Sequence, residues 1–257
     1  MNYKLLFLLI FFISIQASAQ LPRVVDVPTR TGVTQRFLLL QPDNPKAVVI
    51  LFAGGDGTLQ LDASGRIQAG SGNFLVRTRE LFAAQGLVVA VIDAPSDRPS
   101  LGGFRQSAEH VADVRATIAW LRQELKLPVW LVGTSRGTQS VAHIATQLAP
   151  DDGGPNGIVL TATMLDDRKG RPVPDMKLAR IKVPVLVVHH VQDGCVFTRL
   201  ADMPKLTAKL GGVPKTELIT VDGGVNVGDA CQARGYHGFA GIEAAVVSKI
   251  AAWIKGN

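Results

Sequence analysis

The stretch VWLVGTSRGTQSVAH, from Val129 to His143, joins an apolar run typical of a buried strand to a pattern typical of a helix. Ser135 lies between the two, with Gly133 and Gly137 on either side. Glycine at both positions permits a sharp turn and a close approach of strand and helix, which lifts a serine hydroxyl clear of the backbone. Ser135 is therefore a candidate nucleophile. A simple turn residue is the alternative, because this spacing alone does not separate the two.

Short apolar runs alternate with longer helical patterns on both sides of this stretch. The strand candidates are KAVVILFAGG, GLVVAVIDAP, LPVWLVGTS, GIVLTATML, VPVLVVHHVQD and TELITVDGG. Helical patterns are predicted for residues 75–85, 104–125, 136–148, 200–210 and 241–255. Near-continuous Val, Ile and Leu are typical of parallel strands that are covered on both faces, and right-handed crossovers place helices on both faces. The sequence therefore predicts a doubly wound, mostly parallel α/β sheet, preceded by an antiparallel hairpin formed by RVVDVP and TQRFLLLQP.

The N-terminus has the three-part layout of an export signal. Lys4 precedes an apolar run from Leu5 to Ile15, and the small-x-small sequence Ala17-Ser18-Ala19 follows. The run is shorter than the roughly 20 residues that span a bilayer, so an uncleaved membrane anchor is the weaker alternative. We expect residues 1–19 to be a signal peptide and residues 20–257 to be a single domain. The mature protein would be periplasmic or secreted, without stable membrane insertion.

Export changes how the only two cysteines are interpreted. Outside the cytosol thiols tend to be oxidised, so Cys195 and Cys231 are predicted to form a disulfide, and two unrelated buried thiols are the alternative. No CxxC or clustered His/Cys spacing indicates a metal site. The formal net charge of +6 comes from scattered basic residues, which does not favour a nucleic-acid partner.

A nucleophilic serine needs a base and an acid from other strand-end loops. Of the five histidines, His237 in ARGYHGFAG follows the last strand and precedes the last helix, which makes it the best base. Asp193 in HHVQDGC follows the preceding strand and is the preferred acid. Other acids in comparable positions are Asp166, Asp167 and Asp222. We expect the serine, the base and the acid to meet at one rim of the sheet within hydrogen-bonding reach. The predicted disulfide would tie the acid loop to the base loop.

The oxyanion that such a reaction forms also needs hydrogen-bond donors. The backbone N–H of Arg136, directly after the serine, is one candidate, and that of Gly55 in LFAGGDGTL is the other. A phosphate cradle is the alternative for this loop. However, the loop lacks the Lys and Ser/Thr of a P-loop, and its spacing does not match a dinucleotide fingerprint, so no cofactor is expected.

Taken together, GTSRG, AGGDG, QDG and YHGF resemble the corresponding motifs of the α/β-hydrolase family, in the same order along the chain. The resemblance implies Ser135 as nucleophile, His237 as base and Asp193 as acid, with the oxyanion held by the two backbone donors. Two residues depart from the family pattern. Ala53 stands where many members carry a histidine that braces the loop, and Arg136 is unusually large.

Residues 165–182 separate two strands where larger members of the family insert a helical lid. Eighteen residues that include Pro172 and Pro174 are too few for one, so no cap domain is expected and the site should accept small or polymeric esters. The sequence therefore predicts a serine hydrolase of carboxylic esters. A peptidase or amidase with the same residues, or a non-catalytic binding protein that has kept the fold, are the alternatives.

Overall fold

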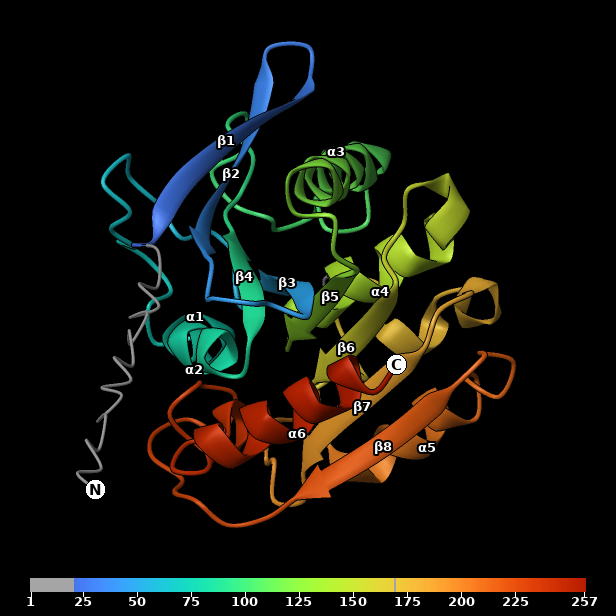
Figure 1. Ribbon diagram of the computed structural model, residues 1–257. Coiled ribbons are helices and arrows are strands. Elements are labelled where there is room, and N and C mark those ends of the chain that lie inside the picture. The colour runs from blue at the N-terminus through green and yellow to red at the C-terminus, as the bar shows by residue number, and fades with distance from the viewer. Residues whose placement is uncertain (1–20, 169) are drawn as a thin grey trace, which may run out of the picture.

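The computed structural model describes residues 21–168 and 170–257 (Figure 1). The expected signal peptide, residues 1–19, lies outside the described residues. Eight strands form one sheet in the order β1-β2-β4-β3-β5-β6-β7-β8. The strands are β1 (Arg23–Arg30), β2 (Val33–Leu40), β3 (Ala47–Phe52), β4 (Leu87–Ile92), β5 (Val129–Thr134), β6 (Gly157–Thr161), β7 (Val185–His190) and β8 (Thr216–Val221). β2 is antiparallel to β1 and β4, and the other neighbours are parallel, which confirms the predicted sheet and N-terminal hairpin.

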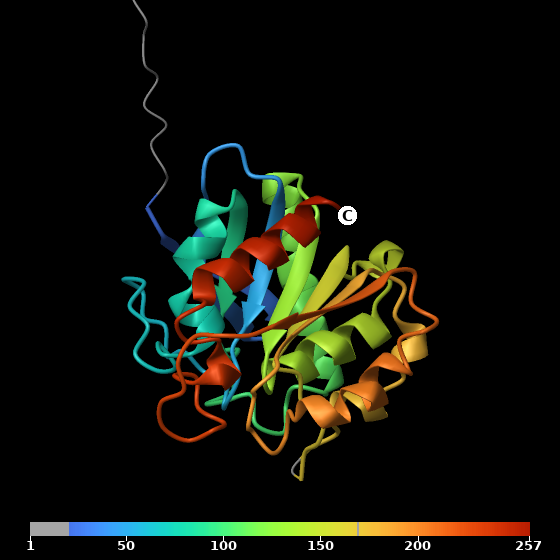
Figure 2. The ribbon, with the colours of Figure 1, turned by 90° about the horizontal axis from the view of Figure 1, so that it is seen from below.

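Helices cover both faces of this sheet, as the sequence predicts. They are α1 (Phe74–Arg77), α2 (Arg79–Ala84), α3 (Ala108–Leu125), α4 (Gly137–Gln147), α5 (Met203–Thr207) and α6 (Glu243–Lys255). One face packs against α3, α4 and α5, and the other packs against α1, α2 and α6 (Figures 1 and 2). The predicted helix at 104–125 begins only at Ala108, because the Ser107 side chain accepts a hydrogen bond from the His110 N–H and caps the helix there.

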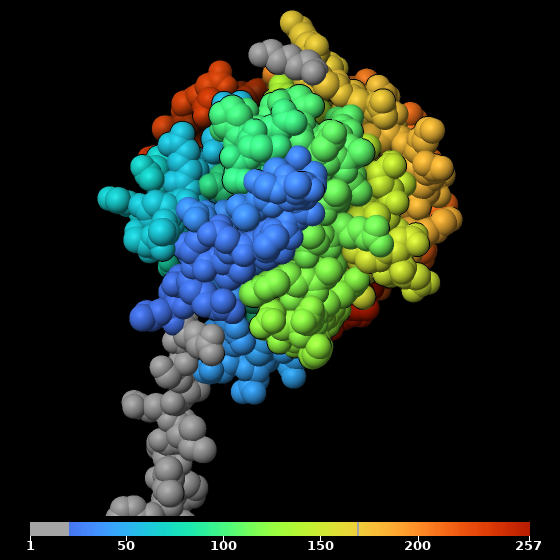
Figure 3. Space-filling model, turned by 90° about the horizontal axis from the view of Figure 1, so that it is seen from above, coloured from blue at the N-terminus to red at the C-terminus, as the bar shows by residue number. Residues whose placement is uncertain are grey.

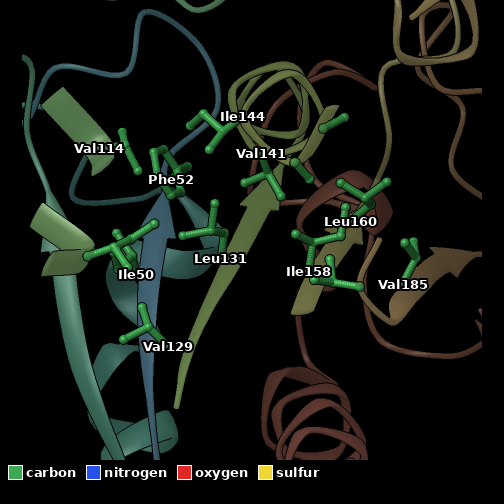
Figure 4. Close-up of a cluster of buried hydrophobic side chains, with 14 of the residues drawn as sticks. Ile50, Phe52, Val114, Val129, Leu131, Val141, Ile144, Ile158, Leu160 and Val185 are labelled. Atoms are coloured by element: carbon green, nitrogen blue, oxygen red, sulfur yellow. The ribbon is translucent and has the colours of Figure 1, made fainter. Parts of the chain in front are cut away.

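The central strands divide their side chains between two hydrophobic cores. In β3, Ile50 and Phe52 belong to the core beneath α3 and α4 (Figure 4), whereas Val49 and Leu51 belong to the core beneath α1, α2 and α6. This alternation explains why the sequence of the strand is continuously apolar, since neither face meets water. β8 is an edge strand with exposed residues, as its mixed composition suggests.

The N-terminal hairpin extends the sheet on the side of α3. It lies against the surface of α3 in the space-filling view (Figure 3). Arg30 at the end of β1 pairs with the buried carboxylate of Asp113 on α3, with an N–O distance of 2.8 Å, which fastens the hairpin to the helix layer. The turn of the hairpin lies beyond the carboxyl end of β4, where the Ser96 N–H donates to the Thr34 carbonyl at 2.9 Å, but no residue of β1 or β2 lines the cavity that contains Ser135.

Candidate active site

Ser135 occupies a sharp turn between β5 and α4. Its φ angle is 51°, in the left-handed region that a serine rarely adopts. Its backbone N–H donates to the Thr161 carbonyl at 3.0 Å, and its own carbonyl accepts from the Thr138 N–H at 2.9 Å. Such a conformation costs on the order of 1–3 kcal/mol and persists only where the surroundings hold it. The residue predicted to be the nucleophile is thus one of six described non-glycine residues with a positive φ angle.

The two flanking glycines have the close contacts that the sequence predicts. A Cβ atom on Gly133 would lie 2.6 Å from the Gly137 carbonyl oxygen, and one on Gly137 would overlap the Phe52 carbonyl at the end of β3. Both obstacles are backbone atoms, which cannot rotate out of the way. The turn can therefore bring α4 against β3 and β5 only when these positions lack side chains.

His237 and Asp193 form a buried hydrogen-bonded pair. His237 Nδ1 lies 2.9 Å from Asp193 Oδ2, and the His237 and Asp193 side chains are 5% and 0% exposed. An ionised carboxylate can only accept, so Nδ1 of the neutral ring carries the proton and Nε2 is left as an acceptor. This is the protonation state that a general base requires.

The carboxylate of Asp193 has further donors. The Cys195 N–H and the Thr198 hydroxyl donate to it at 3.0 and 2.9 Å. Burial alone would raise the pKa of Asp193, but the hydrogen bond from His237 and these two donors outweigh it and hold the pKa below its usual value. Thr198 also lies 3.3 Å from His237 Nδ1, and the sequence analysis missed it because nothing in the chain marks it as part of the site.

The other candidate acids lie elsewhere. Asp167 pairs with the Arg136 guanidinium at 3.0 Å and accepts from Gln139 Nε2 at 2.8 Å. Asp222 is exposed and caps the backbone of Gly223, and Asp166 is also exposed. Among the described residues, the carboxylate that hydrogen-bonds to His237 is that of Asp193.

Three contacts fasten the loop that carries His237. The predicted disulfide between Cys195 and Cys231 is present and joins this loop to the turn that carries Asp193. Arg77 donates to the Gly238 carbonyl at 2.6 Å, and the Tyr236 ring stacks on His190 with ring centroids 4.4 Å apart. Because these contacts already restrict the loop, aligning His237 for reaction costs less conformational entropy.

Ser135 and His237 line the same cavity, which has a volume of about 690 Å³. The Ser135 hydroxyl, however, is oriented towards Met164, with its oxygen 3.8 Å from the sulfur, and makes no hydrogen bond with another described residue. Of the two expected hydrogen bonds, the one between Asp193 and His237 is present, and the one between His237 and Ser135 is not. A serine hydroxyl turns by rotation about one bond, and such hydrogen bonds often form only when substrate is bound.

The two backbone groups predicted to hold an oxyanion are available. Gly55 has a φ angle of 58° and lines the cavity beside Ser135, and a Cβ atom on it would meet nothing within 4 Å. Arg136 stands at the N-terminus of α4, where the helix dipole favours negative charge. Neither the N–H of Gly55 nor that of Arg136 donates a hydrogen bond to another described residue.

The side chain of Arg136 faces a neighbouring cavity of about 400 Å³, rather than the one that contains Ser135. Its ion pair with Asp167 offsets its charge there. Within the described residues, no group of three or more His, Cys, Asp or Glu side chains could hold a metal ion. Across the same residues, no helix combines the length and the apolar character needed to cross a membrane.

Comparison with known proteins identifies the fold. No family model and no curated protein matches the sequence. Among solved structures, the chain is similar to an esterase from Pyrococcus furiosus, with a TM-score of 0.66, 12% identity and coverage of 97% of this chain and 96% of that chain. It is also similar to a dienelactone hydrolase from Anabaena variabilis, with a TM-score of 0.65, 14% identity and coverage of 92% and 97%. An α/β serine hydrolase homologue from Coxiella burnetii gives a TM-score of 0.60, 14% identity and coverage of 92% and 98%. The protein has the α/β-hydrolase fold.

Proposed function

We propose that this protein is a serine hydrolase of carboxylic esters, with Ser135 as nucleophile, His237 as general base and Asp193 as the acid that orients it. The observation that carries the proposal is the buried His237–Asp193 hydrogen bond of 2.9 Å on the cavity that also contains the strained serine. The esterase and dienelactone hydrolase among the structural neighbours support this chemistry. At such low sequence identity these neighbours support the fold, and they do not identify the substrate.

The reaction begins when the Ser135 hydroxyl rotates away from Met164 and attacks the ester carbonyl carbon, while His237 Nε2 takes its proton. The negative charge that develops on the carbonyl oxygen is held by the N–H groups of Gly55 and Arg136. Collapse of this intermediate expels the alkoxide, which takes the proton from His237 and leaves as an alcohol. Water then attacks the acyl-enzyme carbonyl and gives a proton to His237. His237 returns this proton to the Ser135 oxygen as the second tetrahedral intermediate collapses, which releases the carboxylic acid and regenerates Ser135.

Small or polymeric esters are the proposed substrates. In the described part of residues 165–182, the only regular structure is two short 3₁₀ turns, Val173–Asp175 and Leu178–Arg180. Neither turn forms a helical lid over the cavity. An acyl chain that needs a deep, closed apolar tunnel is therefore a poorer substrate in this proposal than a short or surface-accessible ester.

The enzyme is proposed to be exported as a single domain of residues 20–257, after removal of residues 1–19. The disulfide supports this, because such bonds persist mainly in oxidising compartments. Expression of the full chain in a bacterial host, followed by mass spectrometry of the exported protein, should give Gln20 as the first residue. A mature protein that retains Met1 would contradict the proposed cleavage.

Ester hydrolysis is tested with p-nitrophenyl acetate and butyrate. Ser135→Ala should lower kcat by about 10⁴-fold or more, since the nucleophile is lost. Ser248→Ala is the matched control, because Ser248 is exposed on α6, away from the cavity. A fluorophosphonate probe should label Ser135 in the folded wild type, as mapped by mass spectrometry. Equal activity of wild type and Ser135→Ala would rule the proposal out, and comparison with matched p-nitroanilides separates an esterase from an amidase.

A further inference from the structure

Arg105 is a buried arginine without a carboxylate partner among the described residues. Its side chain, from the loop between β4 and α3, is only 5% exposed. Arginine is almost never buried unless it is paired, so its hydrogen bonds need an explanation. They go to neutral groups: the carbonyl oxygens of Ala53 and Gly55 at 3.0 and 3.1 Å, and the Ser140 hydroxyl at 3.1 Å. Burial lowers the pKa of Arg105 to about 9, which still leaves the guanidinium protonated at neutral pH.

The two carbonyls lie on either side of the peptide that contains the Gly55 N–H. That peptide joins Gly54 to Gly55, and its own carbonyl accepts from the Gly57 N–H at 3.2 Å. The C=O and N–H of a trans peptide point in opposite directions. Three consecutive carbonyls therefore have partners, and together they determine where the Gly55 N–H points.

Arg105 also joins the two elements that carry the proposed oxyanion donors. One end of the guanidinium contacts the loop after β3, and Nη1 donates to Ser140 on α4, the helix that begins beside Arg136. The loop packs closely against the guanidinium: a Cβ atom added to Gly57 would overlap it. A single planar group with fixed donor directions thus spans both halves of the proposed oxyanion site.

We propose that Arg105 is a positioning residue that holds the N–H groups of Gly55 and Arg136 at the spacing and direction an oxyanion requires. Ala53 has no side chain able to brace this loop, and the guanidinium braces it instead from the side of α3. The inference rests on the proposed ester hydrolysis. A group that acts on the donors should affect the transition state more than the bound ester, and so change kcat rather than KM.

The test compares Arg105→Met and Arg105→Lys with wild type on p-nitrophenyl butyrate. Both variants should lower kcat by about 10- to 100-fold and leave KM within about threefold, because a lysine keeps the charge but not the fork that spans both elements. The matched control is Arg122→Met. Arg122 also donates to a carbonyl, that of Gly154 at 2.7 Å, but at the opposite end of the parallel strands. The control should lose stability and keep kcat.

A kcat within about twofold of wild type in folded Arg105→Met would overturn the inference. If that variant does not fold, the same kcat in Arg105→Lys would overturn it. Hydrogen exchange of the peptide spanning residues 53–57 adds a reading that is independent of turnover. Exchange there should become faster in the Arg105 variants and stay unchanged in Arg122→Met, and unchanged exchange in all of them would also overturn the inference.

These readings separate the two proposals. If wild type hydrolyses no ester while the Arg105 variants loosen residues 53–57, ester hydrolysis fails and the bracing of the loop stands. If hydrolysis depends on Ser135 but not on Arg105, ester hydrolysis stands and the positioning role fails.

Discussion

Replacement of His110 by phenylalanine should make the protein more resistant to acid. His110 lies on α3 and is 1% exposed, with its ring packed edge-on against Phe52 and Phe104, at centroid distances of 6.2 and 5.4 Å. Neither ring nitrogen has a hydrogen-bond partner among the described residues. A phenylalanine would keep the aromatic contacts and remove two unpaired polar atoms, which is expected to be neutral or stabilising at neutral pH.

The magnitude follows from the pKa of the buried ring. Burial, with smaller contributions from the charges of Arg105, His143 and Arg30, lowers the pKa of His110 from 6.5 to about 3. Between these two values the unfolded chain binds a proton at this position and the folded chain does not. Stability therefore falls as the pH drops below 6.5, by about 1.4 kcal/mol per pH unit. The contribution of His110 should therefore make the free energy of unfolding about 3 kcal/mol lower at about pH 4 than at about pH 8.

Urea unfolding at both pH values measures this difference. Acid weakens wild type and variant alike through their shared carboxylates, so the informative quantity is the extra loss of unfolding free energy in wild type. That extra loss should be about 3 kcal/mol. Equal losses in the wild type and the His110→Phe variant would refute the reasoning, because they would mean that His110 is protonated as readily in the folded as in the unfolded chain.

Three further predictions concern the site and its frame. Asp193→Asn should keep the fold and lower kcat on p-nitrophenyl esters by about 10⁴-fold, since an amide can stabilise the wrong tautomer of the base; a loss under tenfold would argue against its role. Gly137→Ala should lower the free energy of unfolding by about 3 kcal/mol, because its Cβ would overlap a backbone carbonyl of β3, whereas Gly212→Ala, with open space around it, should change little in the same urea titration. Replacing both Cys195 and Cys231 by alanine should cost about 4 kcal/mol, as expected for a sequence separation of 36 residues, and an unchanged urea midpoint would contradict this.

The order and type of the main elements could be predicted from the sequence. Near-continuous apolar runs and stripes at helical spacing depend on local residue order, and the predicted ends of the strand and helix around Ser135 lie within about two residues of the observed ends. Helix boundaries were less exact where a cap decided them, as at Ser107, or where one predicted helix divided into α1 and α2.

The choice among the candidate acids needed the folded chain. Asp193, Asp166 and Asp167 all follow strands, and a sequence records position along the chain and not the direction in which a carboxylate points. The contacts that place Thr198 and Arg105 here are distant in the chain: His237 is 39 residues from Thr198, and Ser140, Gly55 and Ala53 are 35, 50 and 52 residues from Arg105. The orientation of the Ser135 hydroxyl towards Met164 is likewise a product of packing.

The sequence by itself determined a doubly wound sheet, a strained serine at the end of a central strand, and the order of serine, acid and histidine, since each of these depends on neighbouring residues or on chain order. The tertiary structure alone decided that the Asp193 carboxylate meets His237 and that the buried guanidinium of Arg105 meets the loop after β3. Both contacts join segments that are distant in the chain, and only the packing of the sheet and helices brings such segments within hydrogen-bonding distance.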